Sequence, residues 1–405
     1  MRARSLLADQ MKVQTGTTNS TESCLWGYLR PNGDVGARNH LLILNATGLT
    51  EPVARRVAQA LPSSILVSSP FGMGVVGRDA EITERCLAGL ATHPNCGAVL
   101  LISADRSRLE RLSERLKEAN KPFAAFALDN AGHDALELTV QALRGGAELR
   151  KIISRESRSE QPVKTLCVAM ECGLSDPTSG IVANPLIGLI ADKIVASGGT
   201  VIVGETLEWL GVESRLADRG ITAKVSEEIR NAVLRREALA VAAGIDLIGV
   251  NPNRRNIEAG LTTIEEKASG STVKSGTAPI MGVLDYAEHP PHPGLWLMDA
   301  ASYTPESLTG FAAAGAQVML FSTGTGNSYT SAICPTLKIS ANEQTVAKLP
   351  LQIDFDASAC LTDGNLEQCA ETLFAELLAT FGGTLTWGEA VGEGGEVISR
   401  YGEAL

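Results

Sequence analysis

The sequence predicts an α/β protein made of two Rossmann-like (flavodoxin-like) domains, each built on a parallel β-sheet. Short apolar runs typical of buried strands alternate with helical patterns along the 405 residues. Hydrophobic residues make up 44% of the chain and aromatic residues only 4%, while the 40 glycines suit frequent tight turns. A charged segment poor in apolar residues, at 151–161, divides the alternation into two series and is typical of a linker.

The first series predicts a domain over residues 23–150. We expect its strands to be parallel, because each is followed by a helix that returns the chain to the same edge of the sheet. The expected strands are 40–45, 64–67, 98–102 and 123–128, and the expected helices are 51–60, 79–91 and 107–120. Residues 1–22 are polar and rich in Thr and Ser, which indicates a disordered tail.

The second series predicts a larger α/β domain over residues 162–405, which also carries the main polar loops. Its expected strands are 165–170, 200–203, 245–250, 279–286, 295–299, 317–322 and 336–339. Its clearest expected helices are 187–196 and 226–243.

Charge and cysteine usage limit the partners and the compartment. The formal net charge of −11 argues against nucleic acid as a partner, because a phosphate-binding face must be basic. The eight cysteines form no CxxC pair, which indicates reduced thiols in a cytoplasmic protein. The sequence shows neither an apolar run of about 18 residues nor a signal peptide, so we expect no membrane association.

The polar segment 171–186 is the most informative stretch of the chain. It lies between the expected strand 165–170 and the expected helix 187–196, so it occupies the strand end where open α/β sheets bind ligands. Cys172 is a candidate metal ligand, or else a small residue packed at a strand end. The other candidates either orient substrate hydroxyls or cap a helix, and they are Ser175, Asp176, Ser179 and Asn184.

Two charged residues further along the chain are candidates for acid–base chemistry. Glu205 follows the expected strand 200–203 and could act as a base or a ligand, although strand-end carboxylates are often only solvated. Lys267 could act as a base or clamp an anion. The glutamates just before it follow threonines at capping-box spacing, which favours a structural role for Glu265.

Two further segments could bind an acid. A Gly-rich loop follows the expected strand 317–322, and its amides either cradle a carboxylate or sulfonate or form a plain tight turn. Its candidate residues are Thr323, Gly324, Gly326 and Asn327. Arg38 and Asn39 precede the strand 40–45, where Arg38 either grips a carboxylate bidentately or forms an interdomain ion pair.

Several motifs in a fixed order make the chain resemble the altronate/galactarate dehydratase family of sugar-acid hydro-lyases. Residues 27–39 are similar to the family's GYxRxxGxxGxRN opening, 171–185 to its CGxSDxxSGxxANP loop, and 204–206 to its GET segment. Residues 259–267 are similar to GGLTTIxEK, and 293–299 and 322–327 match further blocks. Such an ordered set is far more specific than a single short motif.

The resemblance implies an enzyme that eliminates the group β to the carboxylate of a small anionic 2-hydroxy acid. It also implies a divalent metal, iron or manganese. Members carry a small SAF-type domain, either fused or as a separate subunit. Because this chain begins near the first motif, we expect a separate small SAF-domain subunit, and we expect an oligomer.

The expected chemistry explains the residue types. Loss of the C2 proton gives an enediolate, which a metal chelated by the carboxylate and the 2-hydroxyl stabilises. A base must take that proton, and an acid or cation must help the C3 group to leave. The catalytic candidates are therefore Glu205, Lys267 and Asp176, the substrate-binding candidates are Arg38, Asn39, Ser175, Ser179, Asn184, Thr323, Gly324, Gly326 and Asn327, and the metal candidate is Cys172.

Two segments depart from the family pattern. The sugar-acid dehydratases carry His-Gly-x-Gly-Cys-Gly where this chain has residues 69–77, with an apolar wall of Phe71, Met73, Val75 and Val76. They carry Gly-Leu-Gly-Cys-Glu where this chain has residues 101–106. We expect a hydro-lyase that converts a sugar acid or another 2-hydroxy carboxylate to a 2-keto acid. The alternatives are a large subunit releasing sulfite and pyruvate from (2R)-3-sulfolactate, and a non-catalytic paralogue.

Overall fold

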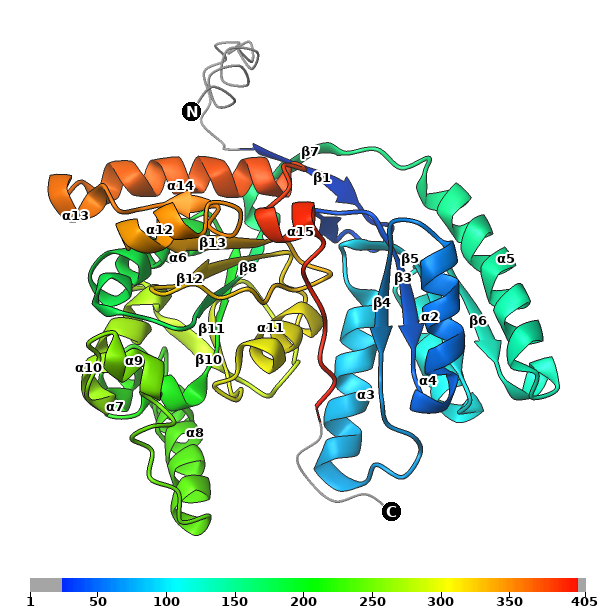
Figure 1. Ribbon diagram of the computed structural model, residues 1–405, viewed down its shortest axis with the longest axis horizontal. Coiled ribbons are helices and arrows are strands. Elements are labelled where there is room, and N and C mark those ends of the chain that lie inside the picture. Colours follow the sequence, from blue (N-terminus) through cyan, green and yellow to red (C-terminus); the bar gives the residue numbers. More distant parts are fainter. Residues whose placement is uncertain (1–23, 400–405) are drawn as a thin grey trace, which may run out of the picture.

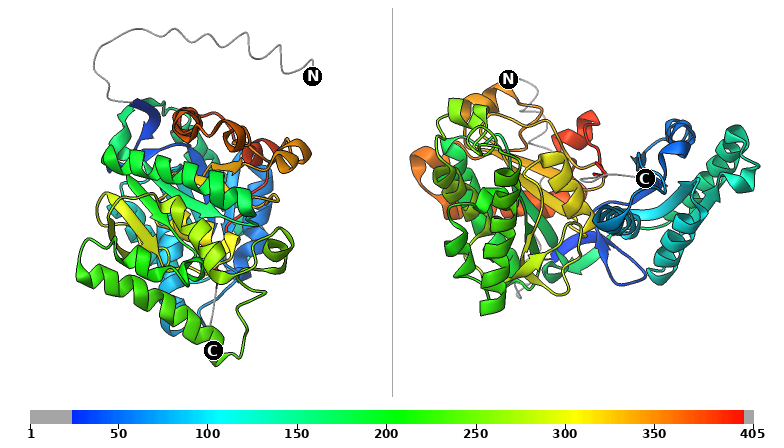
Figure 2. Two further views of the ribbon diagram at one scale, coloured as in Figure 1. Left: turned by 90° about the vertical axis from the view of Figure 1, so that its left-hand side faces the viewer. Right: turned by 90° about the horizontal axis from the view of Figure 1, so that it is seen from below.

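The protein folds into two α/β lobes in a computed structural model that describes residues 24–399. The right-hand view of Figure 2 separates a lobe coloured blue to cyan from one coloured green to orange. Each lobe holds a parallel sheet flanked by helices, so the predicted fold class is confirmed. The tail predicted for residues 1–22 lies outside the described residues.

The first lobe is a four-stranded sheet with helices on both faces. Its strands are β3 (His40–Asn45), β4 (Ser64–Ser68), β5 (Cys96–Ser103) and β6 (Phe123–Ala127). Its helices are α2 (Glu51–Ala60), α3 (Gly77–Thr92), α4 (Arg106–Glu118) and α5 (Ala135–Ile153). All pairs in the order β4-β3-β5-β6 are parallel. Helices α2 and α5 cover one face and α3 and α4 the other (Figure 1), which explains why β5 is buried along its whole length.

The second lobe is built on a seven-stranded parallel sheet. Its strands are β8 (Cys167–Cys172), β9 (Thr200–Val203), β10 (Ile280–Leu284), β11 (Gly294–Met298), β12 (Val318–Ser322), β13 (Thr336–Ser340) and β14 (Phe355–Asp356). Its helices are α6 (Asn184–Ala196), α7 (Glu213–Ala217), α8 (Ala223–Ala242), α9 (Arg254–Glu258), α10 (Ile264–Thr272), α11 (Thr304–Ala313), α12 (Glu343–Lys348), α13 (Cys360–Asp363), α14 (Leu366–Phe381) and α15 (Trp387–Val391). The strand order is β10-β11-β9-β8-β12-β13-β14.

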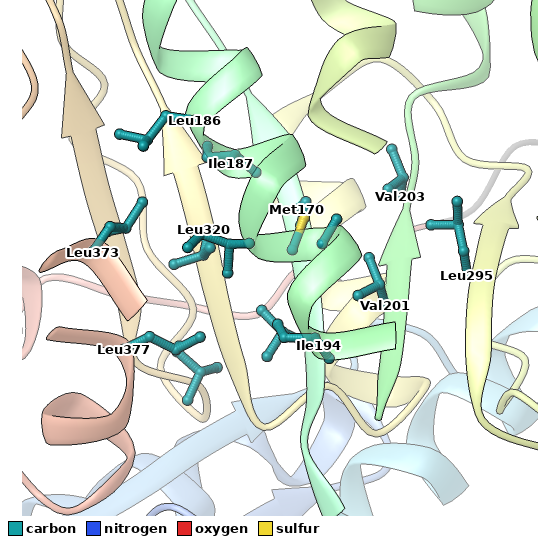
Figure 3. Packing of buried hydrophobic residues seen from close by; sticks show 14 of the residues in the cluster. Met170, Leu186, Ile187, Ile194, Val201, Val203, Leu295, Leu320, Leu373 and Leu377 are labelled. Carbon is teal, nitrogen blue, oxygen red and sulfur yellow. The ribbon is translucent and has the colours of Figure 1, made fainter. Parts of the chain in front are cut away.

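The core of the second lobe lies between its sheet and the helices α6, α8 and α14. Figure 3 shows Met170 of β8 and Val201 of β9 facing the helix α6. The stretch Ser179–Ala196, which includes α6, is 18 residues long and apolar enough to cross a membrane. Here Ile187 and Ile194 of α6 are fully buried between the sheet and α14, so this segment forms part of the protein core.

The opposite face of the large sheet shares its core with the first lobe. One buried cluster includes Phe321 of β12, Phe311 of α11 and Leu87 of α3. A Cβ added to Gly89 of α3 would lie 2.0 Å from the Ala313 carbonyl oxygen of α11. These two helices therefore pack backbone to backbone, and the lobes are joined by a continuous apolar core.

A small antiparallel sheet connects the lobes at one end. It consists of β1 (Cys24–Leu29), β2 (Val35–Gly36) and β7 (Ser159–Pro162), in the order β2-β1-β7. Strand β7 lies mostly within the predicted linker 151–161, so part of that segment is a strand. Leu25 and Val35 belong to the core of the second lobe, although the sequence places them in the first domain.

The strand predicted at 245–250 is wrong. Only isolated bridges join Gly249 and Val250 to Asn253. Helix α8 carries the chain away from the large sheet (Figure 1), so this apolar run has no strand to pair with. Ile245, Ile248 and Val250 are instead exposed.

Candidate functional site

The carboxyl ends of neighbouring strands in the large sheet converge on one site. The chain passes from the central strand β8 to β9 on one side and later reaches β12 on the other. Such a switch point is where open α/β sheets bind ligands. The Gly173 N–H donates to the Ser322 carbonyl oxygen at 3.0 Å, which joins the ends of β8 and β12.

Cys172, the last residue of β8, belongs to a buried charged cluster. Its thiol donates to Glu208 Oε2 at 3.2 Å. The Lys274 ammonium donates to Cys172 Sγ at 3.0 Å and to the same Glu208 oxygen at 2.8 Å. Glu208 is the most exposed of these three residues, at only 2%, so the network is shielded from solvent.

Glu208 is held by ammonium groups on both sides. Its Oε1 lies 2.8 Å from Lys267 Nζ, which also donates to Asn251 Oδ1. Burial alone would raise the pKa of Glu208, but Lys267 and Lys274 outweigh burial and hold that pKa well below its usual range. Glu208 is therefore ionised near neutral pH.

A second carboxylate, Glu171, borders the cluster. Its Oε1 accepts the Cys172 N–H at 3.0 Å and lies 3.9 Å from Lys274 Nζ. Its Oε2 accepts a hydrogen bond of 2.5 Å from Ser307 in α11. Both oxygens therefore have partners within the protein.

Glu205 differs from the other two carboxyl groups because one of its oxygens has no partner. It follows β9 in the left-handed region, with a φ of 63°. Its Oε2 is buried without a hydrogen bond among the described residues. Burial raises the pKa of Glu205 well above its usual value, and the nearby Glu171 and Glu208 raise it further. Glu205 is the cluster's natural carrier of a proton.

The formal charges of the cluster agree with a proton on Glu205. Three carboxyl groups face two ammonium groups, and a proton on Glu205 makes the numbers equal. Burial, followed by the charge of Glu208, raises the pKa of the Cys172 thiol to about 11, so the thiol is neutral at rest. The directions of these pKa shifts favour the neutral form of Glu205 and Cys172 and the charged form of Glu208.

Cys172, Glu205 and Glu208 could hold a metal ion. One ligand atom from each lies within 4.8 Å of the others, and all three residues are buried. A sulfur with two carboxylates suits a divalent transition metal such as iron, and Glu205 Oε2 offers an unused donor. Because Lys274 Nζ contacts two of the same residues, a metal ion must displace its ammonium group from Cys172 and Glu208.

A large cavity of the protein lies elsewhere. It has a volume of about 1710 Å³ and is lined by α3, α4 and the loop around Pro290. It also touches Cys167 and Thr200, the first residues of β8 and β9, at the edge of the sheet opposite the charged cluster. The charged cluster is therefore closed over in this structure.

The structure brings Cys172, Glu205 and Lys267 together from three separate motifs. Their predicted roles stay predictions, but their placement agrees with a common site. The main residues that sequence reasoning missed are Glu208 and Lys274. Glu208 lies three residues after Glu205, a spacing that could have indicated a carboxylate pair. Lys274 follows α10 in a polar stretch typical of a surface.

The other polar residues of the 171–186 segment organise the loop. Asp176 accepts hydrogen bonds from the Ser179 N–H at 3.0 Å and from Asn342 Nδ2 at 2.7 Å. Asn184 Nδ2 donates to the Gly270 carbonyl oxygen at 2.8 Å. Ser175 differs, because its buried Oγ has no partner among the described residues. Ser175 is thus the member of this group with a hydroxyl left for a ligand.

The Gly-rich loop forms a tight turn. The Gly324 and Thr325 amides donate to the Leu174 carbonyl oxygen at 3.2 and 3.1 Å. The Thr323 amide donates to the Ile339 carbonyl oxygen, and the Gly326 amide to Thr323 Oγ1. Asn327 Nδ2 contacts Thr304. These four amides are occupied within the chain, so the loop is not arranged as an open anion cradle.

Arg38 and Asn39 lie at the junction of the lobes. Arg38 pairs bidentately with Glu389, at 2.6 and 2.8 Å, and donates its remaining N–H groups to backbone carbonyl oxygens. Asn39 bonds Arg30 and the Ile153 carbonyl oxygen. The structure does not bring these two residues to the charged cluster, and the Arg38 fork binds an internal carboxylate.

The apolar residues within 69–77, which we expected to form one wall of the site, differ in burial. Val75 is buried, whereas Met73 is 76% exposed and Val76 is also exposed. Met73 and Val75 line the cavity between the lobes. That cavity lies at the end of the large sheet opposite Cys172 and Glu205.

Family models match both lobes. Residues 163–403 match the model described as D-galactarate/altronate dehydratase, C-terminal. Residues 27–150 match the model described as D-galactarate dehydratase/altronate hydrolase, second domain. Together these matches cover the charged cluster and both parallel sheets.

Curated relatives extend the match. The chain is 35% identical to the (2R)-sulfolactate sulfo-lyase subunit beta of Chromohalobacter salexigens, over 93% of this chain and 97% of the relative. It is 31% identical to altronate dehydratase of Escherichia coli, over 89% of this chain and 74% of the relative. It is 30% identical to altronate dehydratase of Bacillus subtilis, over 83% of this chain and 69% of the relative. The chain therefore belongs to the altronate/galactarate dehydratase family of lyases.

Proposed function

We propose that this chain is the large subunit of a lyase that eliminates sulfite from 3-sulfolactate. The observation that carries this proposal is the 35% identity to a sulfo-lyase subunit along 97% of that subunit's length. The altronate dehydratases match less closely and over 74% or less of their length. This evidence favours the alternative over the dehydratase reading that the sequence put first.

The charged cluster supports an elimination. Once Glu205 has released its own proton, its carboxylate takes the C2 proton, and the C2–H electron pair forms the C2–C3 double bond. The C3–S electron pair leaves with sulfite, and the resulting enol gains a proton at C3 and loses its hydroxyl proton to give pyruvate. The raised pKa of Glu205 makes its carboxylate a stronger base than an ordinary one, which suits an acidic C–H.

The lysines and the metal site have complementary roles in this proposal. Lys267 lies beside Glu208 and contacts Asn251, so its ammonium group can turn to a substrate carboxylate. A divalent ion bound by Cys172, Glu205 and Glu208 would supply Lewis-acid stabilisation of the enediolate. We propose iron or manganese, and the sulfur donor favours iron.

A second subunit is part of the proposal. The sulfo-lyase relative is named as a subunit beta, so that enzyme has more than one kind of chain. We propose a small SAF-type partner for this chain, an oligomeric assembly and a cytoplasmic location. The closed state of the cluster is consistent with a site that opens or is completed when the partner binds.

A hydro-lyase acting on a sugar acid is the second candidate. It is favoured by the identities of 31% and 30% to two altronate dehydratases. Both reactions begin with removal of a C2 proton, so the same cluster serves either. They differ only in the group that leaves C3.

One assay tests the proposal against both alternatives. The chain, with its small partner, is offered 3-sulfolactate, hexonates and aldarates, and the release of 2-keto acid and sulfite is followed. We expect equal amounts of pyruvate and sulfite from 3-sulfolactate. Release of 2-keto acid from a hexonate or aldarate alone would establish the dehydratase. Inactivity toward all three classes would favour a non-catalytic paralogue.

A further inference from the structure

Two arginines of α8 bind one aspartate at the carboxyl end of β11 and belong to no role described so far. Arg235 Nη2 donates to Asp299 Oδ2 at 3.1 Å, and Arg236 Nε donates to Asp299 Oδ1 at 3.0 Å. Asp299 directly follows β11, inside the motif at 293–299. The arginines therefore reach the carboxyl edge of the large sheet from the helix that covers it.

Strand pairing and a side-chain hydrogen bond place Asp299 beside the segment that carries Glu205. Strands β9 and β11 are parallel neighbours, with Leu297 opposite Val203. Beyond the ends of these strands the two segments stay in contact, because the Thr206 N–H donates to the Ala300 carbonyl oxygen at 3.2 Å. Thr206, the residue after Glu205, donates to Asp299 Oδ1 at 2.8 Å. Asp299 thus connects the arginine pair to the segment that carries Glu205.

The charges of this group do not balance. Two guanidinium groups share one carboxylate, which leaves one excess positive charge in a chain of net charge −11. Arg235 and Arg236 each donate one hydrogen bond within the described residues, so most of their N–H groups are unused. Their side chains are 55% and 26% exposed, whereas that of Asp299 is 5% exposed. One arginine would suffice to pair with the aspartate.

We propose that Arg235 and Arg236 form a subsite for a second anionic group of the substrate, carried on C3. This inference rests on the proposed elimination at Glu205 and adds the class of substrate, a short acid with two anionic ends. The C1 carboxylate lies toward the lysines, and a C3 oxyanion, sulfonate or carboxylate, lies toward the arginines. Guanidinium groups bind such oxyanions through paired N–H donors.

The arginine subsite also bears on the leaving group. As the C3–S bond breaks, sulfite gains negative charge, and a cation beside it stabilises the departing group more than the bound substrate. The neutral hydroxyls of a sugar acid would gain much less from two guanidinium groups. The pair therefore selects for a charged C3 substituent.

Binding of unreactive acids tests the subsite without turnover. Propanoate has one anionic end, whereas succinate and 3-sulfopropanoate have two. Each is titrated by calorimetry into the complex of the full-length chain with its small partner, and into the same complex made with Arg235→Gln, Arg236→Gln or the double variant. Arg230→Gln is the matched control, because Arg230 lies on the same helix but faces Asp218, at 3.9 Å. Thermal melting confirms that each variant is folded.

We expect the wild-type chain and Arg230→Gln to bind a two-ended acid at least about tenfold more tightly than propanoate. The double variant should lose this preference to within about twofold, and Arg236→Lys, which keeps the charge, should retain part of it. Tighter binding of 3-sulfopropanoate than of succinate identifies a sulfonate subsite, and the reverse order a carboxylate subsite. A double variant that keeps the full preference overturns the inference alone. A wild-type chain that binds none of the acids overturns the proposed function with it.

Discussion

The carboxyl ends of the two parallel sheets occupy equivalent positions but have different chemistry. At the end of the four-stranded sheet, Thr50 Oγ1 donates to Asn45 Oδ1 at 2.6 Å, and Asn45 Nδ2 donates to Ser68 Oγ at 2.7 Å. These groups are neutral, and each has a partner. At the end of the seven-stranded sheet, three carboxyl groups face two ammonium groups, and Glu205 Oε2 has no partner within residues 24–399.

The difference shows that a favourable topological position does not make a site. Both sheets satisfy the rule that ligands bind at the carboxyl ends of parallel strands. At the carboxyl end of the second sheet, three carboxyl groups lie around a thiol and two ammonium groups, and shifted pKa values occur there together with an unsatisfied carboxyl oxygen, which are the physical marks of a functional centre. We therefore place the chemistry of this protein at the second sheet.

The largest effect should come from Glu208→Gln at the second sheet. The amide leaves Lys267 and Lys274 buried beside a neutral group, which costs about 3–5 kcal/mol in the free energy of unfolding. Because the pKa of Glu208 is lowered in the folded protein, its contribution is present above the usual carboxyl pKa and lost as the pH falls. Urea unfolding at pH 7 and at pH 4 should show the cost shrinking with acidity. A loss below 1 kcal/mol at pH 7 would contradict the electrostatic account.

Glu205→Gln should separate activity from stability at the same site. Turnover should fall by at least about 10²-fold, the usual effect of losing a proton-transfer group. Stability should not fall, because the pKa of Glu205 is raised in the folded protein, and ionising it as the pH rises destabilises the fold. The amide of the variant cannot ionise and is not destabilised in this way. The melting temperature of the variant relative to wild type should therefore increase from pH 5 to pH 8. Unchanged turnover would remove Glu205 from the chemistry.

The pKa of Glu205 is raised and that of Glu208 is lowered, although the two residues are only three positions apart. This difference marks the limit of what the sequence can predict. Strand–helix alternation predicted both parallel sheets, because local apolar patterns determine which segments are buried. The motifs identified Cys172, Glu205 and Lys267 as candidates. Lys274 was missed because a lysine in a polar stretch looks like surface, and its burial depends on Glu208, 66 residues away.

Arg38 illustrates the same limit, because the sequence predicted its type of interaction but not its partner. A bidentate grip on a carboxylate was one expectation for it, and the structure shows such a grip on Glu389, 351 residues away. The sequence could not distinguish an internal carboxylate from a substrate, because that depends on how the carboxyl-terminal segment returns to the junction of the lobes. The pairing of Arg38 with a residue distant in sequence, and not its residue type, decided between a substrate carboxylate and an internal one.

The smallest expected effect comes from Thr50→Val at the first sheet, which is the counterpart of Glu205→Gln. Valine keeps the shape of threonine but removes the donor to Asn45 Oδ1, so unfolding should become easier by about 1–3 kcal/mol. Turnover should stay within about twofold of wild type, because a neutral network whose groups all have partners has no proton to give and no free donor to offer. Urea unfolding and pyruvate release, measured on the same preparation, give both numbers. A fall in turnover as large as that of Glu205→Gln would show that the first sheet takes part in the reaction after all.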